Sequence, residues 1–431
     1  MIGPARIEHD SLGTVEVPDN ALYGAQTARA VENFRVSGVT LGDVPELLDA
    51  LLQVKIAAAR ANSEAGEVSP EVGEAIVRAG REVLDGKWRD QFPIDVVQGG
   101  GGTATNMNVN EVLANRAGEL LGGARGVYDR VHPNDHVNRS QSTNDVYPTA
   151  LHLAVVSAGR RAAAEFNHLA RTFERKATEF DGLRHIGRTC IQDALPVTVE
   201  ATHRSHAYAI DRTTGDLQRT LADLDAVPLG ATVLGTGFGA SPKYRQLVIR
   251  ALSDETSIRL KASANPFDAL SHSDPLVAVA SALMRVVLVI AQTAQDLRLL
   301  CSGPNGGFGE VRLPAVQVGS SAMPGKVNPV IPELVLQVAF EVRGAHQTIE
   351  AAVAAGEFEV NVMEPVIAKH LLTSLRDAGR MARLFSDRCV AGLVWDTARV
   401  HANLAGSYAD AMVLAATAGY AVASSAAAQL D

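Results

Sequence analysis

Residues 275–300 read PLVAVASALMRVVLVIAQTAQDLRLL, and a helix over this stretch would carry apolar side chains on more than one face. Helical periodicity also runs through residues 149–180, 200–224, 331–356 and 365–393. These stretches of roughly 25–32 residues far exceed the average helix of about 11–12 residues. Helices of this length with apolar surface on several sides need other helices to cover them. The sequence therefore predicts a mainly α fold, a multi-helix bundle in contact with neighbouring chains.

Shorter elements precede this bundle. The first forty residues are broken by glycine and proline, and a helical pattern begins near Val44. A second helix is predicted after Ser69, which can cap it, with Pro70 at the first helical position. We expect an N-terminal mixed and helical domain, a central long-helix domain and a short C-terminal helical domain, at residues 1–142, 143–395 and 396–431.

Composition narrows the class of protein. The chain has 431 residues and a formal net charge of −9, so it carries no overall basic field that would attract nucleic acid. Its three cysteines are widely separated and form no CxxC pair, which argues against a disulfide framework. The N-terminus shows no secretory signal, and the apolar run 275–291 is interrupted by Arg285 and too short to span a bilayer. We expect a cytoplasmic protein that binds neither nucleic acid nor membrane.

Four segments between the helices are rich in small polar residues. They are GGGGTATNMN at 99–108, HPNDHVNRSQSTND at 132–145, GRTCIQDALP at 187–196 and GSSAMPGKVNP at 319–329. Each one alone is also typical of ordinary caps and turns. The last segment is more informative, because two serines, a lysine and an asparagine lie close together between glycines and prolines. Neutral donors with one cation suit a carboxylate ligand, whose desolvation they offset.

Phosphate-binding motifs do not fit these segments. Five residues separate Gly319 from Gly325, and Val327 follows Lys326, whereas a P-loop needs four residues and a Ser or Thr after its lysine. Residues 99–104 lack the third glycine of a dinucleotide-binding fingerprint. We expect no cofactor.

A zinc site is also not expected. His132 and His136 are four residues apart, but Pro133 argues against a helix that would bring them to one face, and no third ligand is near. We therefore expect no metal.

GSSAMPGKVNP resembles the signature loop of the aspartase/fumarase superfamily, whose pattern is GSSxMPxKxNP. The resemblance covers nearly the whole chain, in the order of the family: DSLGTVEVP, LYGAQTAR, GTATNMNVNEVLANRA, HPNDHVNRSQSTNDVYPTA, GRTCIQDALP, PLGATVLGTG, DLRLLCSGP and NVMEP. So many ordered motifs are specific for the superfamily and much less specific for the substrate. The resemblance implies a long-helix bundle in a three-domain plan, with the C-terminal domain shortened here.

The resemblance also implies roles for individual residues. Ser320 would be the general base, acting as an alkoxide, while Lys326 would stabilise negative charge and bind a substrate carboxylate together with Asn328. The other residues expected to contact the substrate are Thr103, Ser142, Thr143, Asn144, Thr189, Cys190, Ser321 and Met323. Glu333 and His132 would lie beside this set without touching the substrate. A homotetramer is implied, in which each active site draws on three subunits.

Members of this superfamily remove a proton beside a carboxylate and expel an amine or water from the neighbouring carbon, giving fumarate. Cys190 stands where fumarases typically carry a histidine. Hydroxide is a poor leaving group that needs a general acid, whereas an amine can depart already protonated. This difference favours elimination of ammonia from L-aspartate, a carbon–nitrogen lyase reaction.

One alternative substrate and two alternative functions stay open. Glu200-Ala201-Thr202 stands where relatives have Gly-Gln-Glu, and Asn305 replaces an arginine, which leaves an N-substituted aspartate as a candidate substrate. A thiol at Cys190 is able to donate a proton, which keeps fumarate hydratase as the alternative activity. A lyase-like protein retained for a structural role is the second alternative, and the intact Ser320 argues against it.

Overall fold

The computed structural model describes residues 4–427, and its contacts divide the chain into two compact units. Unit 1 comprises Met1–Arg160, Gln218–Ser281 and Gly344–Leu375. Unit 2 comprises Arg161–Leu217, Ala282–Arg343 and Arg376–Asp431. The predicted division into three consecutive domains stays a prediction. The two units are defined by contacts, and each combines segments that are distant in the chain.

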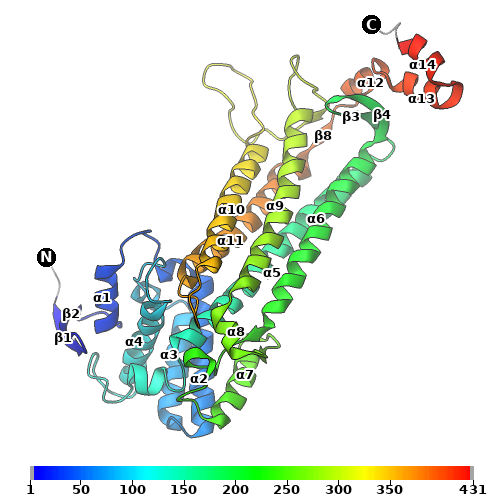
Figure 1. The fold of residues 1–431 in the computed structure, drawn as a ribbon. Helices are drawn as coiled ribbons and strands as arrows, with labels where there is room; N and C mark the ends of the chain where they lie inside the picture. The colour runs from blue at the N-terminus through cyan, green and yellow to red at the C-terminus, as the bar shows by residue number, and fades with distance from the viewer. Residues whose placement is uncertain (1–3, 428–431) are drawn as a thin grey trace. The chain divides into compact units, whose positions relative to one another are not determined.

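Five long helices confirm the predicted mainly α, long-helix architecture (Figure 1). They are α5 (Thr143–Glu179), α6 (Val199–Ala222), α9 (Asp274–Leu300), α10 (Val330–Ala354) and α11 (Glu364–Arg388). The predicted bounds are close to these, except that α5 begins before Pro148 rather than after it. A proline this close to the start of a helix removes one backbone hydrogen bond and leaves the rest intact.

Unit 1 contains the shorter helices. They are α1 (Ala25–Asn33), α2 (Pro45–Ala65), α3 (Pro70–Leu84), α4 (Thr103–Leu120), α7 (Pro242–Thr256) and α8 (Pro266–Ser271). Helix α2 packs against α3 and α7, and its buried side chains include Leu48, Leu51 and Leu52. As predicted, Ser69 caps α3, because its hydroxyl accepts the Val72 N–H at 3.3 Å. Two strand pairs complete the unit: antiparallel β1 (Ala5–Asp10) with β2 (Gly13–Pro18), and parallel β5 (Ala226–Val227) with β6 (Lys261–Ala262).

Unit 2 contains two antiparallel strand pairs and the C-terminal helices. The pairs are β3 (Arg184–Thr189) with β4 (Gln192–Thr198), and β7 (Val311–Arg312) with β8 (Val394–Trp395). Helix α12 (Thr397–Ala405) contacts β3, and α13 (Ala409–Ala418) and α14 (Tyr420–Ala427) follow it (Figure 1).

The core of unit 2 shows how its long helices pack. Gly379 on α11 lies against Ala162 on α5, where a Cβ would meet the Ala162 Cα at 3.1 Å. Farther along, the rings of Phe173 and Phe385 meet edge to face with centroids 6.2 Å apart. A small residue at one level and two aromatic rings at the next let these helices interdigitate.

Helix α9 is longer than residues 275–291, the apolar run that we judged too short to span a bilayer. It has 27 residues, and within the described part of the chain it is the one helix long and apolar enough to cross a membrane. Half of its most apolar stretch is buried, and the core helices of globular proteins can be equally long and apolar.

Candidate active site

The signature loop, residues 319–329, belongs to unit 2 and leads into α10. The Asn328 side chain donates to the Gly319 carbonyl at 2.8 Å and closes the neck of the loop. Gly319 has no room for a side chain, because a Cβ would lie 2.2 Å from the Lys326 carbonyl oxygen. Ser321, Met323 and Lys326 are exposed. The sequence thus specifies a narrow neck with exposed polar groups beyond it.

The hydroxyl oxygen of Ser320 accepts hydrogen bonds from the backbone of the signature loop. Its oxygen accepts the backbone N–H groups of Ala322 at 3.2 Å and Met323 at 3.1 Å. Two donors directed at one oxygen favour negative charge on it. Hydrogen bonds of this kind, to N–H groups two and three residues on, also stabilise a local turn of the chain.

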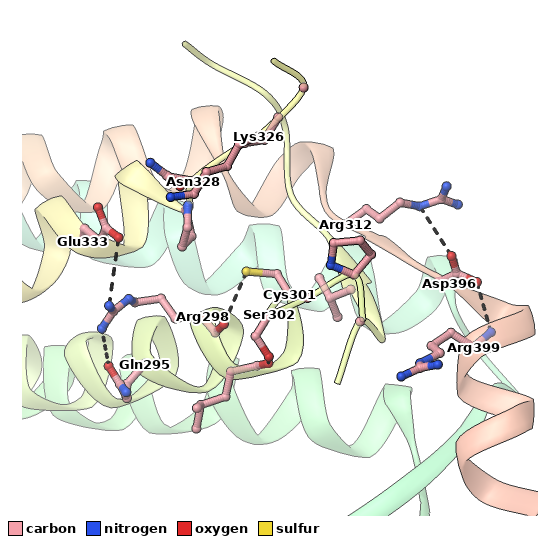
Figure 2. Close-up of a pocket in the computed structure, with 18 residues that line it drawn as sticks. Gln295, Arg298, Cys301, Ser302, Arg312, Lys326, Asn328, Glu333, Asp396 and Arg399 are labelled. Carbon is pink, nitrogen blue, oxygen red and sulfur yellow. Dashed lines mark hydrogen bonds and ion pairs between the residues drawn. The ribbon is translucent and has the colours of Figure 1, made fainter. Parts of the chain in front are cut away.

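Beside the loop lies a cavity of about 930 Å³ within unit 2 (Figure 2). Lys326 and Asn328 form part of its wall, whereas Ser320 lies outside the set of lining residues. The charged lining residues are Arg298, Arg312, Lys326, Glu333, Asp396 and Arg399. Because cations outnumber carboxylates, the cavity favours an anionic ligand.

Glu333 is paired within this cavity. Its carboxylate lies 3.9 Å from the Arg298 guanidinium, which also donates to the Gln295 side chain at 2.8 Å (Figure 2). The sequence prediction missed Arg298. The only signal was a cation in the last turn of a helix, where such a residue is ordinarily explained by the helix dipole.

Thr189 and Cys190 lie at the tip of the β3–β4 hairpin in unit 2. Cys190 and Ile191 have φ of 54° and 63°, so both residues of this two-residue turn are left-handed. Such turns match the twist of the strands but usually contain Asn or Gly. Thr189, Cys190 and Ile191 are exposed. Among the described residues, no hydrogen bond or ion pair joins this tip to the signature loop.

The remaining predicted contacts belong to unit 1, at two helix N-termini. Thr103 begins α4, is exposed, and donates its hydroxyl to the Gly100 carbonyl at 2.8 Å. Ser142 precedes α5, and its hydroxyl accepts the Asn144 N–H at 3.2 Å. Exposed N–H groups at helix N-termini favour anions. Both segments are therefore suited to a carboxylate.

Behind Thr143 the structure reveals a polar network. The Asn106 amide donates to the Thr143 hydroxyl at 3.0 Å and to Asn138 at 3.2 Å. The Lys55 ammonium donates to Asn138 at 2.9 Å and to Gln141 at 3.0 Å. Lys55 is fully buried. The sequence prediction missed this lysine, although a single charge in an otherwise apolar stretch of helix was a usable signal.

Burial shifts the pKa values of Lys55 and of Asp145, which lies nearby. It lowers the pKa of Lys55 to about 7 and raises the pKa of Asp145 to about 6. The Asp145 carboxylate accepts backbone N–H groups from Ser142 at 2.9 Å, Thr232 at 2.8 Å and Gly230 at 3.0 Å, which oppose the effect of burial. A neutral Lys55 amine still has the two N–H donors that its two acceptors need.

Asn108 is directed away from this network. It is buried, and its amide donates to the Gln91 carbonyl at 3.0 Å inside the fold of unit 1. Asn108 is therefore not available to a carboxylate ligand, although it lies in the polar segment 99–108, whereas Asn106 in the same segment bonds to Thr143.

His132 caps a short π-helical turn, Pro133–Val137. Its Nδ1 accepts N–H groups from Asn134 at 3.3 Å and Asp135 at 3.1 Å. The expectation that Pro133 excludes a helix here was wrong, because a proline at the first helical position loses no backbone hydrogen bond. Within the described residues, no group of three side chains is arranged to hold a metal ion.

A long-helix fold that carries a Ser-Lys-Asn loop defines the aspartase/fumarase class of lyase. The chain belongs to the lyase family whose profile matches residues 13–344. An aspartate ammonia-lyase from Bacillus sp is 44% identical over 90% of this chain and 82% of its own length. A Brucella melitensis structure titled fumarate lyase:delta crystallin, bound to cobalt, aligns with a TM-score of 0.96 at 43% identity, covering 99% of this chain and 93% of that one. A class II fumarase from Schistosoma mansoni aligns with a TM-score of 0.95 at 34% identity, covering 98% and 91%. The predicted superfamily and enzyme class are confirmed.

Proposed function

We propose that this protein eliminates ammonia from L-aspartate to give fumarate. The observation that carries the proposal is the Ser320 hydroxyl oxygen, which accepts two backbone N–H groups and is thereby prepared to carry negative charge. The family assignment and the likeness to a Bacillus aspartate ammonia-lyase support this substrate.

The elimination proceeds in two steps. The Ser320 alkoxide takes a proton from the carbon beside one carboxylate, and the C–H electron pair moves into that carboxylate to form an enediolate. Lys326 and Asn328 hold this group as its negative charge develops, since a preorganised cation and donor stabilise it more than water does. The electron pair then forms the double bond as the C–N bond breaks. The substrate ammonium leaves as ammonia, so the hydroxyl-bearing Ser320 and fumarate remain.

We assign the other predicted contacts to the far end of the substrate. The segments at Thr103 and 142–144 offer hydroxyl and backbone N–H donors for the second carboxylate, and Thr143 is held by Asn106. Thr189, Cys190, Ser321 and Met323 would line the rest of the pocket, with Glu333 and His132 beside them. No step needs a metal or cofactor.

We further propose a cytoplasmic homotetramer in which each active site draws segments from three subunits. Mixing is a direct test. Subunits with Ser320→Ala and subunits with Thr143→Ala are each expected to be inactive, and mixed tetramers should regain part of the activity, because some sites then contain neither substitution. Absence of regain in a tetramer that has exchanged subunits would contradict shared sites.

Fumarate hydratase is the second candidate, favoured by the likeness to the Schistosoma mansoni fumarase. It would require a general acid for the departing hydroxide, and Cys190 is the residue available at the position where fumarases carry a histidine. An N-substituted aspartate is the third substrate to test.

The deciding experiment follows fumarate formation by ultraviolet absorbance with L-aspartate, L-malate and an N-alkyl aspartate. We expect turnover of L-aspartate, and a decrease of about 10²–10⁴-fold in Ser320→Ala, the usual contribution of a general base. Ser271→Ala is the matched control, because that hydroxyl donates to the Phe267 carbonyl within its own helix, α8. Turnover of L-malate alone would overturn the proposal in favour of the hydratase.

A further inference from the structure

A buried ion pair in unit 2 joins two parts of the chain that lead to predicted substrate contacts. Arg188 donates to both carboxylate oxygens of Glu310, at 2.6 and 3.0 Å. The side chains are 15% and 0% exposed, respectively. A bidentate arginine–carboxylate pair fixes direction as well as distance, because both groups are planar.

The surroundings of Glu310 leave it little freedom. Asn403 on α12 donates to its carboxylate at 2.8 Å. The Glu310 N–H donates to the Leu300 carbonyl at 2.9 Å, and its own carbonyl accepts the Asp396 N–H at 2.8 Å. Glu310 is thus tied to the end of α9 and to the start of α12.

Arg188 is held just as closely. Its guanidinium carbon lies 4.4 Å from the ring centroid of Phe308, a cation–π contact. The pairing of β3 with β4 shifts between Ile186 and Arg188, and an irregularity of this kind redirects the next side chain. Gly187 permits the close approach, because a Cβ there would lie 2.7 Å from the Leu195 carbonyl oxygen.

The residues that follow Arg188 and Glu310 in the chain connect this ion pair to predicted substrate contacts. Arg188 directly precedes Thr189 and Cys190 at the exposed hairpin tip, and Glu310 directly precedes β7, the strand that leads toward the signature loop. The exposed tip itself has a turn of two left-handed residues without glycine, so its position depends on what holds the strand below it.

We propose that Arg188 and Glu310 are positioning residues, which hold the Thr189–Cys190 tip in a fixed place relative to β7, the strand that leads toward the signature loop. The effect on turnover rests on the proposed function. The effect on the hairpin does not, since it concerns the geometry of unit 2 alone.

The experiment must separate positioning from stability. Replacing a buried ion pair by apolar residues of similar volume often leaves stability unchanged or higher. The double variant Arg188→Met/Glu310→Met is therefore expected to unfold within a few degrees of the wild type while lacking the bidentate tie. Arg188→Lys, which keeps the charge and loses the fork, is the second variant and reports on the same tie if the double variant does not fold.

Two readouts are measured on the full-length protein. Hydrogen exchange of the peptide covering residues 184–198 is expected to speed up in both variants, and kcat for L-aspartate is expected to fall at least about tenfold, because small misplacements of a contacting group are costly. Arg383→Gln is the matched control in unit 2. It breaks an exposed pair with Asp387 on α11 and should alter neither readout.

Each outcome decides. Faster exchange with lowered kcat and unchanged unfolding temperature supports the positioning role. Wild-type exchange and wild-type kcat in a folded double variant overturns it. Failure of the wild type to turn over L-aspartate would overturn the proposed function instead, and the exchange rates would still decide whether the pair positions the tip.

Discussion

The two groups of predicted substrate contacts are built in opposite ways. In unit 1, Thr143 is held by Asn106, which is linked through Asn138 to the buried Lys55. In unit 2, the hydrogen bonds of the signature loop mostly join its own residues, and Met323 is 52% exposed. A buried, connected network is rigid before substrate arrives, whereas an exposed loop of this kind is free to order around the substrate. We therefore predict that the contacts within unit 1 are formed before substrate binds, and that the signature loop within unit 2 becomes ordered on binding.

The neck of the loop offers the strongest way to break this comparison. Gly319→Ala places a Cβ 2.2 Å from the Lys326 carbonyl oxygen, and a backbone atom cannot rotate away. We expect kcat/KM to fall about 10²-fold, because the clash displaces the predicted substrate-contacting residues of the loop. The unfolding temperature should not change, since the loop is exposed.

Gly306→Ala is the matched control in unit 2. A Cβ at Gly306 meets no atom within 4 Å, so neither activity nor stability should change. A Gly319→Ala enzyme with wild-type kinetics would show that the neck does not set the geometry of the loop.

A substitution in the hydrogen-bond network of unit 1 should lower the stability of the protein. Lys55→Met removes the donor that Asn138 and Gln141 share, so the Gln141 oxygen loses this hydrogen bond and the Asn138 oxygen keeps the one from Asn106. We expect a loss of about 1–3 kcal/mol in the free energy of unfolding, measured by urea denaturation. Arg250→Met, which breaks an exposed pair with Glu64, should change it by less than about 0.5 kcal/mol. Equal effects of the two substitutions would argue against a rigid network.

The same lysine predicts a dependence of stability on pH. Burial holds the folded pKa of Lys55 at about 7, below its ordinary value of 10.5. Between these values the unfolded chain binds more protons at this residue, so its contribution to stability rises with pH, by at most about 1.4 kcal/mol per pH unit. Asp145 acts in a lower window, because its folded pKa of about 6 lies above 3.8, and its contribution falls as pH rises between them.

The measurement is the free energy of unfolding from pH 7 to 10, compared between the wild type and Lys55→Met. We expect the difference between them to widen as pH rises. A constant difference over this range would contradict a depressed pKa at Lys55.

The smallest effect is expected for an exposed side chain of the loop. Met323→Ala should change the free energy of unfolding by less than about 0.5 kcal/mol, as is usual for exposed positions. If Met323 contacts the substrate, KM for L-aspartate rises a few-fold with kcat nearly unchanged, because uniform binding is lost. A large loss of stability would show that the loop is part of the folded core.

Local patterns carried much of the prediction. The apolar periodicity of the long stretches located α6, α9, α10 and α11, since helical period is a property of neighbouring residues. Ser69 and Pro70 marked the start of α3 for the same reason. The turn at Pro133 was misjudged, because a helix-breaking residue is also the preferred first residue of a helix.

Local sequence patterns did not predict which way the polar side chains face. Asn106 and Asn108 stand two apart on α4, where side chains face different sides of the helix, and only one of them bonds to Thr143. Neither residue type nor spacing states which side faces the pocket. That depends on what packs against α4.

The sequence by itself determined the long helices, the superfamily motifs and the reactive loop, because each of these depends on residues close together in the chain. Only the tertiary structure decided which polar groups are partners. Lys55 and Asn138 are 83 residues apart, and Arg188 and Glu310 are 122 residues apart. Hydrogen bonds and charge pairs act over a few ångströms in space, whatever the distance along the chain, so the fold must be known before such pairs can be recognised.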